Sequence, residues 1–334
     1  MNSPLAYGDI KAATERAAGH IRPVTLTLFD PGAIRTAHRD PLDDRDPAPC
    51  NVWAAMEFMQ HTGSFKARGA QNFIQAHKEA GTLPQTGVTI ASGGNAGLAC
   101  AWAAAQQRVR ATVFLPTTAP AVKVDKLRAY GADVELVGDE YAEAAEACAE
   151  FARTSGALAS HAYDHPLIAA GAGTLMEEIH QQLPQVDTVV VAVGGGGLFT
   201  GVATAARHHG VRVVAVEPEN CRALNAAIEA GHVVDVPVDS IAADSLGARR
   251  TSTMARHAAQ QAGVPSFLVP DEEIVKARRA LWDHRRLAVE YGAATALAGL
   301  TATGGYVPQC EENVVVILCG ANTDPTTLTP RPLS

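Results

Sequence analysis

The chain has 334 residues, of which 47% are hydrophobic and 19% charged, and a formal net charge of −8 at pH 7. This size predicts one large or two ordinary domains with a substantial core, and the acidic balance argues against a nucleic-acid-binding surface. No apolar run is long enough to predict a membrane span, and the first residues lack the basic region followed by an apolar stretch that would predict a signal peptide. The six cysteines lack a Cys-x-x-Cys pair, which favours reduced thiols in the cytoplasm over a zinc or redox motif.

The N-terminal part of the chain predicts helices, a loop and a strand. A helix is expected over residues 9–19, where Asp9 can cap the start and a glycine can end it. Residues 33–51, rich in Pro, Asp and Arg, predict a surface loop. A strand over residues 52–58 leads into a helix over residues 66–80.

Short apolar runs then alternate with Ala-rich helical stretches. Strands are predicted over residues 88–91, 111–115, 133–137, 188–193, 212–216, 266–269 and 314–318. Helices between them are predicted over residues 97–107, 141–154 and 198–208. The alternation indicates an α/β, doubly wound fold with a mostly parallel sheet, which binds ligands at the carboxyl ends of its strands. The polar, Pro-rich residues 323–334 predict a weakly structured tail.

One lysine stands in a run of small and hydroxyl residues, His61-Thr62-Gly63-Ser64-Phe65-Lys66-Ala67-Arg68-Gly69. Lysine is the side chain that forms a Schiff base with a carbonyl cofactor such as pyridoxal phosphate. A single lysine is most simply a solvated surface residue. Three glycine-containing segments that follow predicted strands change this interpretation.

The first of these segments, Gly194-Gly195-Gly196-Gly197, follows a Val-rich strand and opens a helix. Its unobstructed N–H groups at the positive end of the helix dipole predict a phosphate site. No Gly-Lys-Ser/Thr follows, and Phe199 and Thr200 replace a third glycine, so the loop is neither a Walker A nor a dinucleotide motif.

The other two segments are Ser92-Gly93-Gly94-Asn95 and Cys319-Gly320-Ala321-Asn322. The first offers N–H groups and the Ser92 hydroxyl to a carboxylate, and Asn95 can donate to a phenolic oxygen. Cys319 ends a buried strand, where it is either a plain core thiol or a weak donor to a ring nitrogen.

Together these residues resemble the fold-type II (tryptophan synthase β-like) pyridoxal-phosphate enzymes, which include serine and threonine ammonia-lyases (dehydratases), serine racemase and cysteine synthase. The resemblance covers residues 9–324, and the pairing of Ser-Phe-Lys with Gly-Gly-Gly-Gly-Leu carries it. It implies two domains, residues 1–66 plus 163–334 as the large cofactor-binding domain and residues 67–162 as the small one. It also implies a homodimer that acts on a small amino acid.

By resemblance, Lys66 is the Schiff-base lysine and the catalytic residue. The residues implied to bind the cofactor are Phe65, Lys66, Asn95, Gly194, Gly195, Gly196, Gly197, Leu198, Ser245, Gly247, Glu290 and Cys319. Those implied to bind the substrate are Ser64, Ser92, Gly93, Gly94 and Asn95.

Within this group the chain is most similar to the liver-type L-serine dehydratases, which share Asn-Ala-Gly after the glycine pair and a cysteine at the position of Cys319. The usual threonine dehydratase has Ser-Ser-Gly-Asn-His, whereas Gly93 and Ala96 stand here in place of the second serine and the histidine. Serine racemase holds a cation with Glu and Asp. Here only Glu217 is present, which leaves a monovalent cation bound by carbonyls near Glu217, Cys221 and Ala223.

The resemblance implies an ammonia-lyase that converts L-serine or L-threonine to a 2-oxo acid and ammonia, with Lys66 removing the α-proton. Three alternatives stay open: a lyase for another β-hydroxy amino acid such as phenylserine or 3-hydroxyaspartate, a cysteine-synthase-like β-replacement enzyme, and a non-catalytic ligand-binding protein. The absence of a second acid at Gly93 argues against a racemase.

Several other polar side chains are predicted to have no catalytic role. The histidines His61, His161 and His165 are expected to be loop or packing residues. Arg249 and Arg250 are expected to be solvated or at a subunit contact, and Glu140, Glu143 and Glu146 to form a solvated helix face.

Overall fold

The computed structural model describes residues 4–30, 34, 36 and 50–328, so most of the loop predicted over residues 33–51 lies outside the described residues. Within them the strands form two sheets, of six and four strands. The six-stranded sheet contains β1 (Leu26–Leu28), β2 (Asn51–Ala55), β7 (Thr188–Ala192), β8 (Arg212–Pro218), β9 (Ser266–Val269) and β10 (Asn313–Ile317). The four-stranded sheet contains β3 (Val88–Ala91), β4 (Ala111–Leu115), β5 (Asp133–Leu136) and β6 (Leu158–Ala159).

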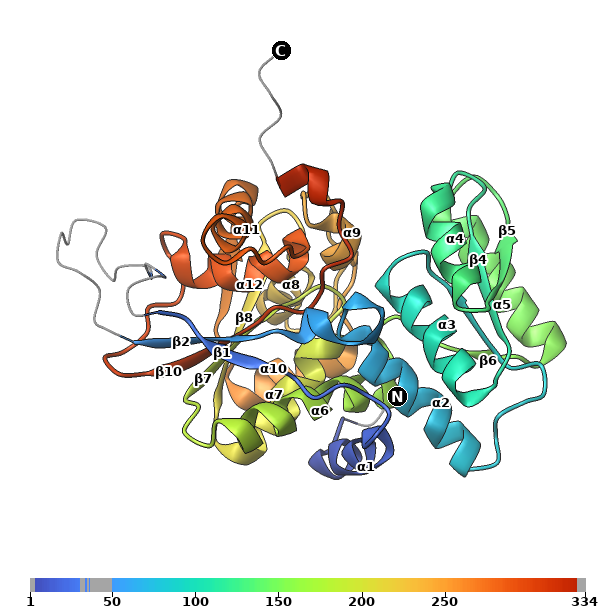
Figure 1. Cartoon of the computed structure of the whole chain (residues 1–334), viewed down its shortest axis with the longest axis horizontal. Coiled ribbons are helices and arrows are strands. Elements are labelled where there is room, and N and C mark those ends of the chain that lie inside the picture. The colour runs from blue at the N-terminus through green and yellow to red at the C-terminus, as the bar shows by residue number, and fades with distance from the viewer. Residues whose placement is uncertain (1–3, 31–33, 35, 37–49, 329–334) are drawn as a thin grey trace, which may run out of the picture.

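The helices divide between the same two halves. Those around the six-stranded sheet are α1 (Tyr7–Ala17), α6 (Pro166–Gln182), α7 (Gly197–His209), α8 (Ala223–Ala230), α9 (Ala243–Leu246), α10 (Thr253–Ala262), α11 (Asp271–Arg285) and α12 (Tyr291–Thr301). Those around the four-stranded sheet are α3 (Asn95–Gln107), α4 (Ala121–Ala129) and α5 (Tyr141–Ser155). Helix α2 (Lys66–Glu79) lies between the halves and packs on both α3 and α6 (Figure 1).

The strand order is β1-β2-β10-β7-β8-β9 in the large sheet and β5-β4-β3-β6 in the small one. All pairings are parallel except β1 with β2. Helices cover both faces of the large sheet, with α6, α7 and α10 on one side and α11 and α12 on the other (Figure 1). The predicted α/β, doubly wound class is therefore confirmed.

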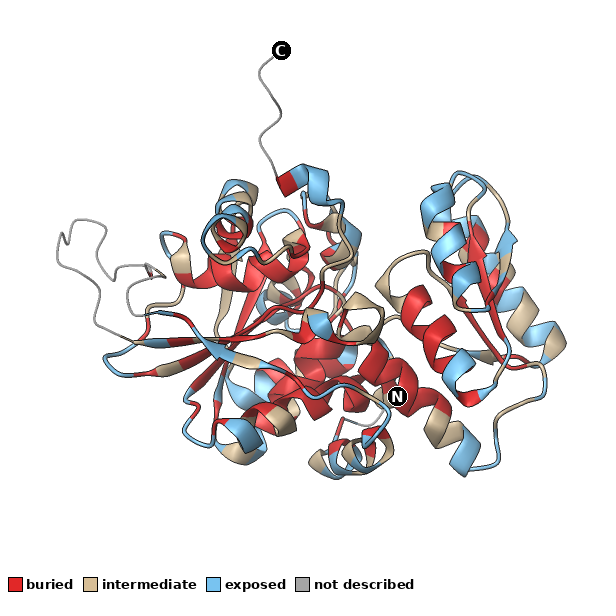
Figure 2. Cartoon of the chain, viewed as in Figure 1, coloured by how far each residue is buried: buried red, intermediate tan, exposed pale blue. Residues whose placement is uncertain are grey.

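Burial follows the sequence pattern of each strand. The run Thr188–Ala192 is apolar except at its first residue, and every residue of this central strand is buried. Most of the buried ribbon surrounds this sheet, whereas the outer helices and strand β5 of the small half are largely exposed (Figure 2). Such continuous apolar strands are expected where helices cover both faces of a parallel sheet. No helix in the described part of the chain is both long and apolar enough to span a bilayer.

The differences from the predicted boundaries have local causes. Helix α1 begins at Tyr7, before Asp9. Asp9 is the third helical residue, and its carboxylate caps the helix by accepting the N–H of Ala6 at 2.9 Å. Strand β2 stops at Ala55 because a 3-10 turn, Glu57–Met59, follows it. A further 3-10 turn, Pro325–Leu328, lies in the predicted tail, whose last residues are not described.

Candidate active site

The carboxyl ends of β2, β10 and β7 point to the same edge of the large sheet, since these strands run parallel. The polypeptide continues from them into the lysine run, Cys319 and the glycine loop. The carboxyl end of β3 brings Ser92 to the same place from the small half. A cavity of about 480 Å³ lies between these segments. The edge predicted from the sequence to bind a ligand is thus the wall of a real cavity.

Lys66 is the first residue of α2 and lines this cavity. Its Nζ donates to the carbonyl oxygen of Ala162 at 2.6 Å and lies 4.8 Å from the centre of the Phe65 ring. Although the residue as a whole is only partly buried, protein encloses the amine, and this burial lowers the pKa of Lys66 from 10.5 to about 8. An uncharged amine therefore forms at mildly alkaline pH, which suits a nucleophile.

The start of α2 is fixed by a buried ion cluster. The Arg68 guanidinium, fully buried, donates to the Glu57 carboxylate at 2.5 and 3.0 Å and to the Glu178 carboxylate at 2.8 Å. Burying these charges is tolerated because every carboxylate oxygen faces the guanidinium. The cluster connects α2 to α6 two residues beyond Lys66.

The glycine loop between β7 and α7 leaves no room for side chains. A Cβ on Gly195 would lie 2.3 Å from the Tyr163 ring, and Gly196 has a φ of 94° with Ala255 2.4 Å from where its Cβ would be. The Gly195 carbonyl accepts the N–H of Ser252 at 3.0 Å, so the loop is fixed to the residue that precedes α10. The N–H groups of the first turn of α7, which have no partner within a helix, remain to bind an anion.

The loop from Ser92 to Asn95 lines the cavity from the small half. It turns tightly into α3 because Gly97 has no side chain; a Cβ there would lie 1.8 Å from the Ser92 carbonyl oxygen. A Cβ on Gly94 would meet nothing within 4 Å. The loop therefore presents open backbone to the cavity, as a carboxylate site requires.

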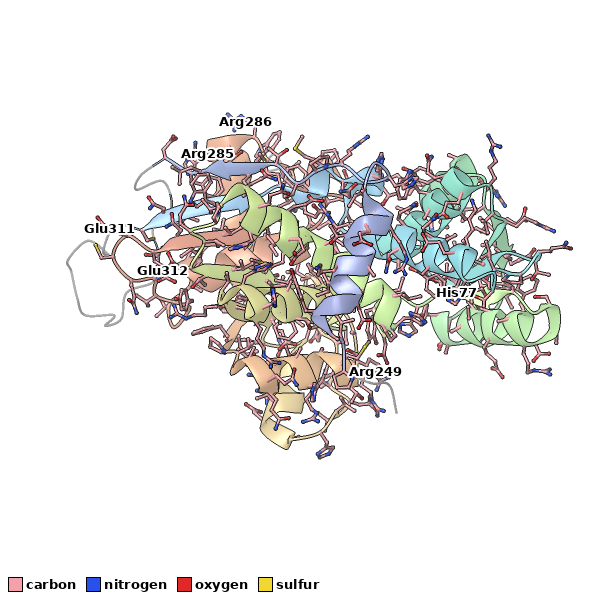
Figure 3. The ribbon with its side chains drawn as sticks, turned by 90° about the horizontal axis from the view of Figure 1, so that it is seen from below. His77, Arg249, Arg285, Arg286, Glu311 and Glu312 are labelled. Atoms are coloured by element: carbon pink, nitrogen blue, oxygen red, sulfur yellow. The ribbon has the colours of Figure 1, made fainter. Side chains whose placement is uncertain are left out.

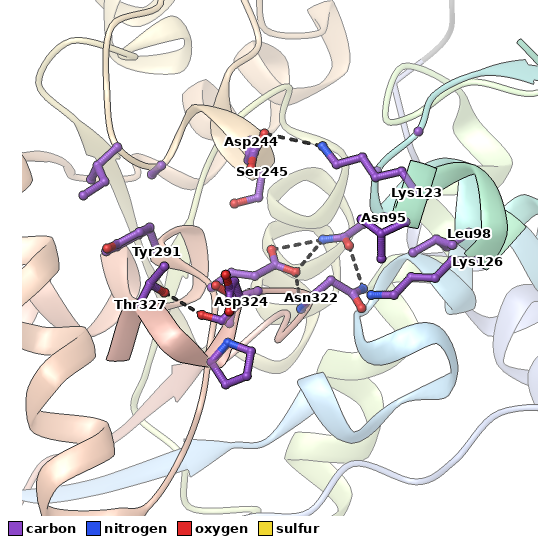
Figure 4. Close-up of a pocket in the computed structure, with 18 residues that line it drawn as sticks. Asn95, Leu98, Lys123, Lys126, Asp244, Ser245, Tyr291, Asn322, Asp324 and Thr327 are labelled. Atoms are coloured by element: carbon purple, nitrogen blue, oxygen red, sulfur yellow. Dashed lines mark hydrogen bonds and ion pairs between the residues drawn. The ribbon is translucent and has the colours of Figure 1, made fainter. Parts of the chain in front are cut away.

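Asn95 is held by two residues of the large half, Glu290 and Asn322. Its Nδ2 donates to both oxygens of Glu290, at 2.9 and 3.0 Å, and its Oδ1 accepts from Nδ2 of Asn322 at 2.8 Å (Figure 4). Burial raises the pKa of Glu290, and the hydrogen bonds from Asn95 and Asn322 oppose this shift. The amide expected to donate to a phenolic oxygen is thus fixed in orientation, with Glu290 behind it.

Cys319 lines the cavity on the large-sheet side. Burial, followed by the nearby Glu290 charge, raises the pKa of its thiol to about 12. The thiol is therefore neutral at ordinary pH, as a weak donor to a ring nitrogen would be.

Most of the other predicted site residues also line this cavity. Those from the two lists above are Phe65, Gly93, Leu198, Ser245, Gly247 and Glu290. Ser64 differs, because it is fully buried outside the cavity wall and its Oγ has no hydrogen-bond partner among the described residues.

A second cavity, of about 630 Å³, adjoins the first and shares Asn95 and Glu290 with it. Lys123 of α4 and Asp244 of α9 face each other across it at 3.8 Å, one from each half of the molecule (Figure 4). The two halves therefore approach each other directly above the candidate site.

In the segment expected to hold a monovalent cation, the Glu217 carboxylate binds backbone N–H groups. Glu217 accepts the N–H groups of Leu224 and Asn225, at 2.8 and 2.7 Å, and so caps α8. Burial raises the pKa of Glu217 to about 8. No cluster of three metal-ligating side chains occurs in the described ranges. The cation near Glu217, Cys221 and Ala223 stays a prediction.

The structure also places the histidines and arginines that were predicted to have no catalytic role. His61 stacks on Trp102 with ring centres 4.5 Å apart. Arg249 is exposed at the edge of the molecule (Figure 3), and Arg250 pairs with Asp235 at 2.8 Å. His161 lies in the turn that contains Ala162.

Three contributors to the site have no signal in the sequence. Ala162 acts through its backbone carbonyl, which no residue type reveals. Tyr163 and Lys123 belong to segments without a motif. Asn322 stands in a segment that was identified, but its role as the partner of Asn95 depends on a contact between residues 227 positions apart.

Comparison with known proteins agrees with this geometry. The family model described as "Pyridoxal-phosphate dependent enzyme" matches residues 41–320. The chain is 35% identical over 279 residues to the L-threonine ammonia-lyase of Geobacter sulfurreducens, covering 83% of this chain and 68% of the relative. It is also 35% identical over 282 residues to the human protein named serine dehydratase-like, covering 81% and 85%.

Among solved structures, a pyridoxal 5'-phosphate-dependent aspartate racemase superimposes with a TM-score of 0.86 at 28% identity, and the match covers 100% of both chains. The family match spans the lysine run, both glycine segments and Cys319. This chain belongs to the fold-type II pyridoxal-phosphate-dependent enzymes.

Proposed function

We propose that this enzyme is an ammonia-lyase that converts a β-hydroxy L-amino acid, L-serine or L-threonine, to a 2-oxo acid and ammonia. The observation that carries the proposal is that a buried amine, an anion-binding loop and an open carboxylate-binding loop surround one cavity. The relatives named for threonine ammonia-lyase and serine dehydratase support the same reaction.

The residues around the cavity fit pyridoxal phosphate. The glycine loop is a cradle that a Cβ at Gly195 or Gly196 would fill, at a helix N-terminus that attracts a phosphate. Lys66 offers an amine of lowered pKa and Phe65 an apolar ring beside it. Asn95 suits the phenolic oxygen, the neutral Cys319 thiol the ring nitrogen, and Leu198, Ser245 and Gly247 the walls.

When bound, pyridoxal phosphate withdraws electrons from the α-carbon of an amino acid and makes its proton acidic. We assign Lys66 to move this proton, because the enclosed amine is uncharged in part of its population near pH 8 and the Ala162 carbonyl holds it in place. The backbone around Ser92, Gly93 and Gly94 binds the substrate carboxylate, while Ser64 would have to turn from its buried position to contribute.

A racemase is the nearest competitor, since racemases occur among the structural neighbours. Racemisation requires a second acid on the face opposite Lys66. Gly93, at the position predicted for that acid, has no side chain, and Leu115 would lie 2.9 Å from a Cβ added there. We therefore propose that β-hydroxyl loss, and not reprotonation on the other face, is the main outcome. Lyases for phenylserine or 3-hydroxyaspartate and a β-replacement enzyme remain alternatives.

We further propose the domain division into residues 1–66 plus 163–334 and residues 67–162, which separates the two sheets. A homodimer rests on the family resemblance. A cytoplasmic location is supported by the six free cysteines.

The experiment is a panel of L-serine, L-threonine, phenylserine, 3-hydroxyaspartate and O-acetylserine with sulfide. Ammonia and 2-oxo acid are measured, and the residual substrate is analysed by chiral chromatography. The proposal expects equimolar 2-oxo acid and ammonia from L-serine or L-threonine with almost no D-isomer. D-isomer that accumulates in place of 2-oxo acid would make the enzyme a racemase, and turnover of O-acetylserine alone would make it a β-replacement enzyme.

A further inference from the structure

The turn between β6 and α6 is held together by one histidine ring. Nδ1 of His161 accepts the backbone N–H of Tyr163 at 3.2 Å and that of Asp164 at 2.8 Å. A ring nitrogen that accepts carries no proton, so the neutral ring has its proton on Nε2. The side chain closes the turn as an asparagine does in an Asx turn.

The same turn contacts both ends of the active-site cavity. Its Ala162 carbonyl accepts the Lys66 amine at 2.6 Å. Its Tyr163 ring occupies the space beside Gly195, at 2.3 Å from where a Cβ would be, and the Tyr163 hydroxyl donates to the Arg250 carbonyl at 3.1 Å. One short segment thus contacts both the Lys66 amine and the glycine loop.

We propose that His161 is a positioning residue for the cofactor: by accepting the N–H groups of Tyr163 and Asp164, its neutral ring fixes the Ala162 carbonyl against Lys66 and the Tyr163 ring against the glycine loop. Protonation of Nδ1 removes the acceptor and releases both contacts. The inference rests on the proposed function as a pyridoxal-phosphate enzyme, and it assigns a role to a side chain that the sequence placed among loop and packing residues.

The surrounding charges determine when the ring is neutral. Residue 161 is exposed as a whole, but enough protein surrounds the ring that burial lowers the pKa of His161; the Asp164 carboxylate opposes this shift and the Lys66 ammonium adds to it. Tyr163, with its ring centre 4.9 Å away, and His165 are the other titratable neighbours. The pKa of His161 in the folded protein lies below the ordinary value of about 6.5. The stabilisation of the turn by His161 is therefore present above that pH and is lost as the pH falls through the lowered pKa.

The test measures the affinity of the apoprotein for pyridoxal phosphate by absorbance titration at pH 8. His161→Phe keeps a ring but lacks the acceptor, and should weaken cofactor binding by roughly tenfold or more, since two N–H groups lose their partner. His161→Asn should retain near-normal affinity, because its Oδ1 can accept the same two N–H groups. The matched control is His165→Phe. The His165 ring also accepts a backbone N–H, that of Leu167 at 3.2 Å, but Leu167 does not line the cavity, whereas Tyr163 does. This change should therefore leave the affinity unaltered.

Three results would overturn the inference. They are unchanged affinity in His161→Phe, an equal loss in His161→Asn, or an equal loss in His165→Phe, which would indicate a general weakening of the turn. In addition, the affinity of the wild type should fall relative to His161→Asn below about pH 6.5, and parallel pH curves would exclude a role for the ring proton. Wild-type protein that binds no pyridoxal phosphate would instead reject the proposed function.

Discussion

The two halves of the molecule meet at the active site but differ in how far their strands are buried. In the large half, β7 is buried along its whole length between β10 and β8. In the small half, the edge strand β5 is mostly exposed and β6 has only two residues (Figure 2). Since buried apolar contacts set the free energy of local opening, the large half should be the more rigid one.

The functional groups divide along the same line. The glycine loop, Cys319 and Glu290 follow elements of the large half, whereas the Ser92 loop and Lys123 belong to the small half. Apart from Asn95 of α3, the groups suited to a permanently bound cofactor therefore lie on the rigid half, and those suited to a substrate that enters and leaves lie on the less buried one. Three pairs of matched substitutions test this division, and a fourth pair compares two carboxylates of the large half.

The largest difference is expected between the two lysines that line the cavity. Lys66→Ala removes the enclosed amine and should lower kcat/KM by about 10²–10⁴, the usual contribution of a proton-transfer group. Lys123→Ala removes only an ammonium that is 42% exposed and 3.8 Å from Asp244, so its effect should stay below about tenfold. Steady-state assays of 2-oxo acid formation decide between them. Equal losses would place Lys123 in the catalytic machinery and end the proposed division.

The second pair compares a glycine from each half. Gly195→Ala places a Cβ 2.3 Å from the Tyr163 ring, whereas a Cβ on Gly94 meets nothing within 4 Å. We expect Gly195→Ala to weaken cofactor affinity by about tenfold or more, because overpacking of a closed site costs about 1–3 kcal/mol. Gly94→Ala should leave cofactor affinity unchanged and affect only KM for the amino acid. Titration with pyridoxal phosphate measures the first effect, and loss of affinity in Gly94→Ala would contradict the comparison.

The third pair concerns stability. Val190→Ala truncates a fully buried side chain of β7 and should lower the free energy of unfolding by about 2 kcal/mol, from the lost methyl groups and the cavity left behind. Val134→Ala truncates a partly buried side chain of β5 and should cost less than about 1 kcal/mol. Urea denaturation of the apoprotein gives both values. If the order were reversed, the large half would not be the more tightly packed one.

The smallest expected effect is a shift in pH dependence. With the Lys66 pKa lowered to about 8, the rate of cofactor attachment should rise with pH, reach half its maximum near that pH and level off above it. Glu290→Gln removes a negative charge that raises the Lys66 pKa, so the rise should move to lower pH. Asp244→Asn changes an exposed carboxylate on the same cavity and should leave the curve in place. Stopped-flow absorbance follows the attachment, and identical curves for all three proteins would show that Glu290 does not act on Lys66.

The sequence by itself determined the class of fold, the strands of both sheets except β1 and the two-residue β6, and the segments that form the site. These features are local: apolar runs of strand length, Ala-rich helices and glycine-rich turns depend on residues that are close along the chain. The lysine run and the glycine loop were identifiable because each chemical task restricts a short stretch of sequence. The three-residue strand β1 escaped prediction because its pairing with β2 joins residues 29 positions apart at Leu26 and Ala55.

Only the tertiary structure decided how these segments work together. Asn95 meets Glu290 and Asn322 because α3 and the chain after β10 are brought to one edge by two different sheets. Ser64, predicted at the substrate, is buried away from the cavity because the residue pairs with Gly320 as the chain enters α2. The Ala162 carbonyl that holds Lys66 belongs to a turn without any motif, since a backbone carbonyl is present in every residue and its direction is set only by the fold.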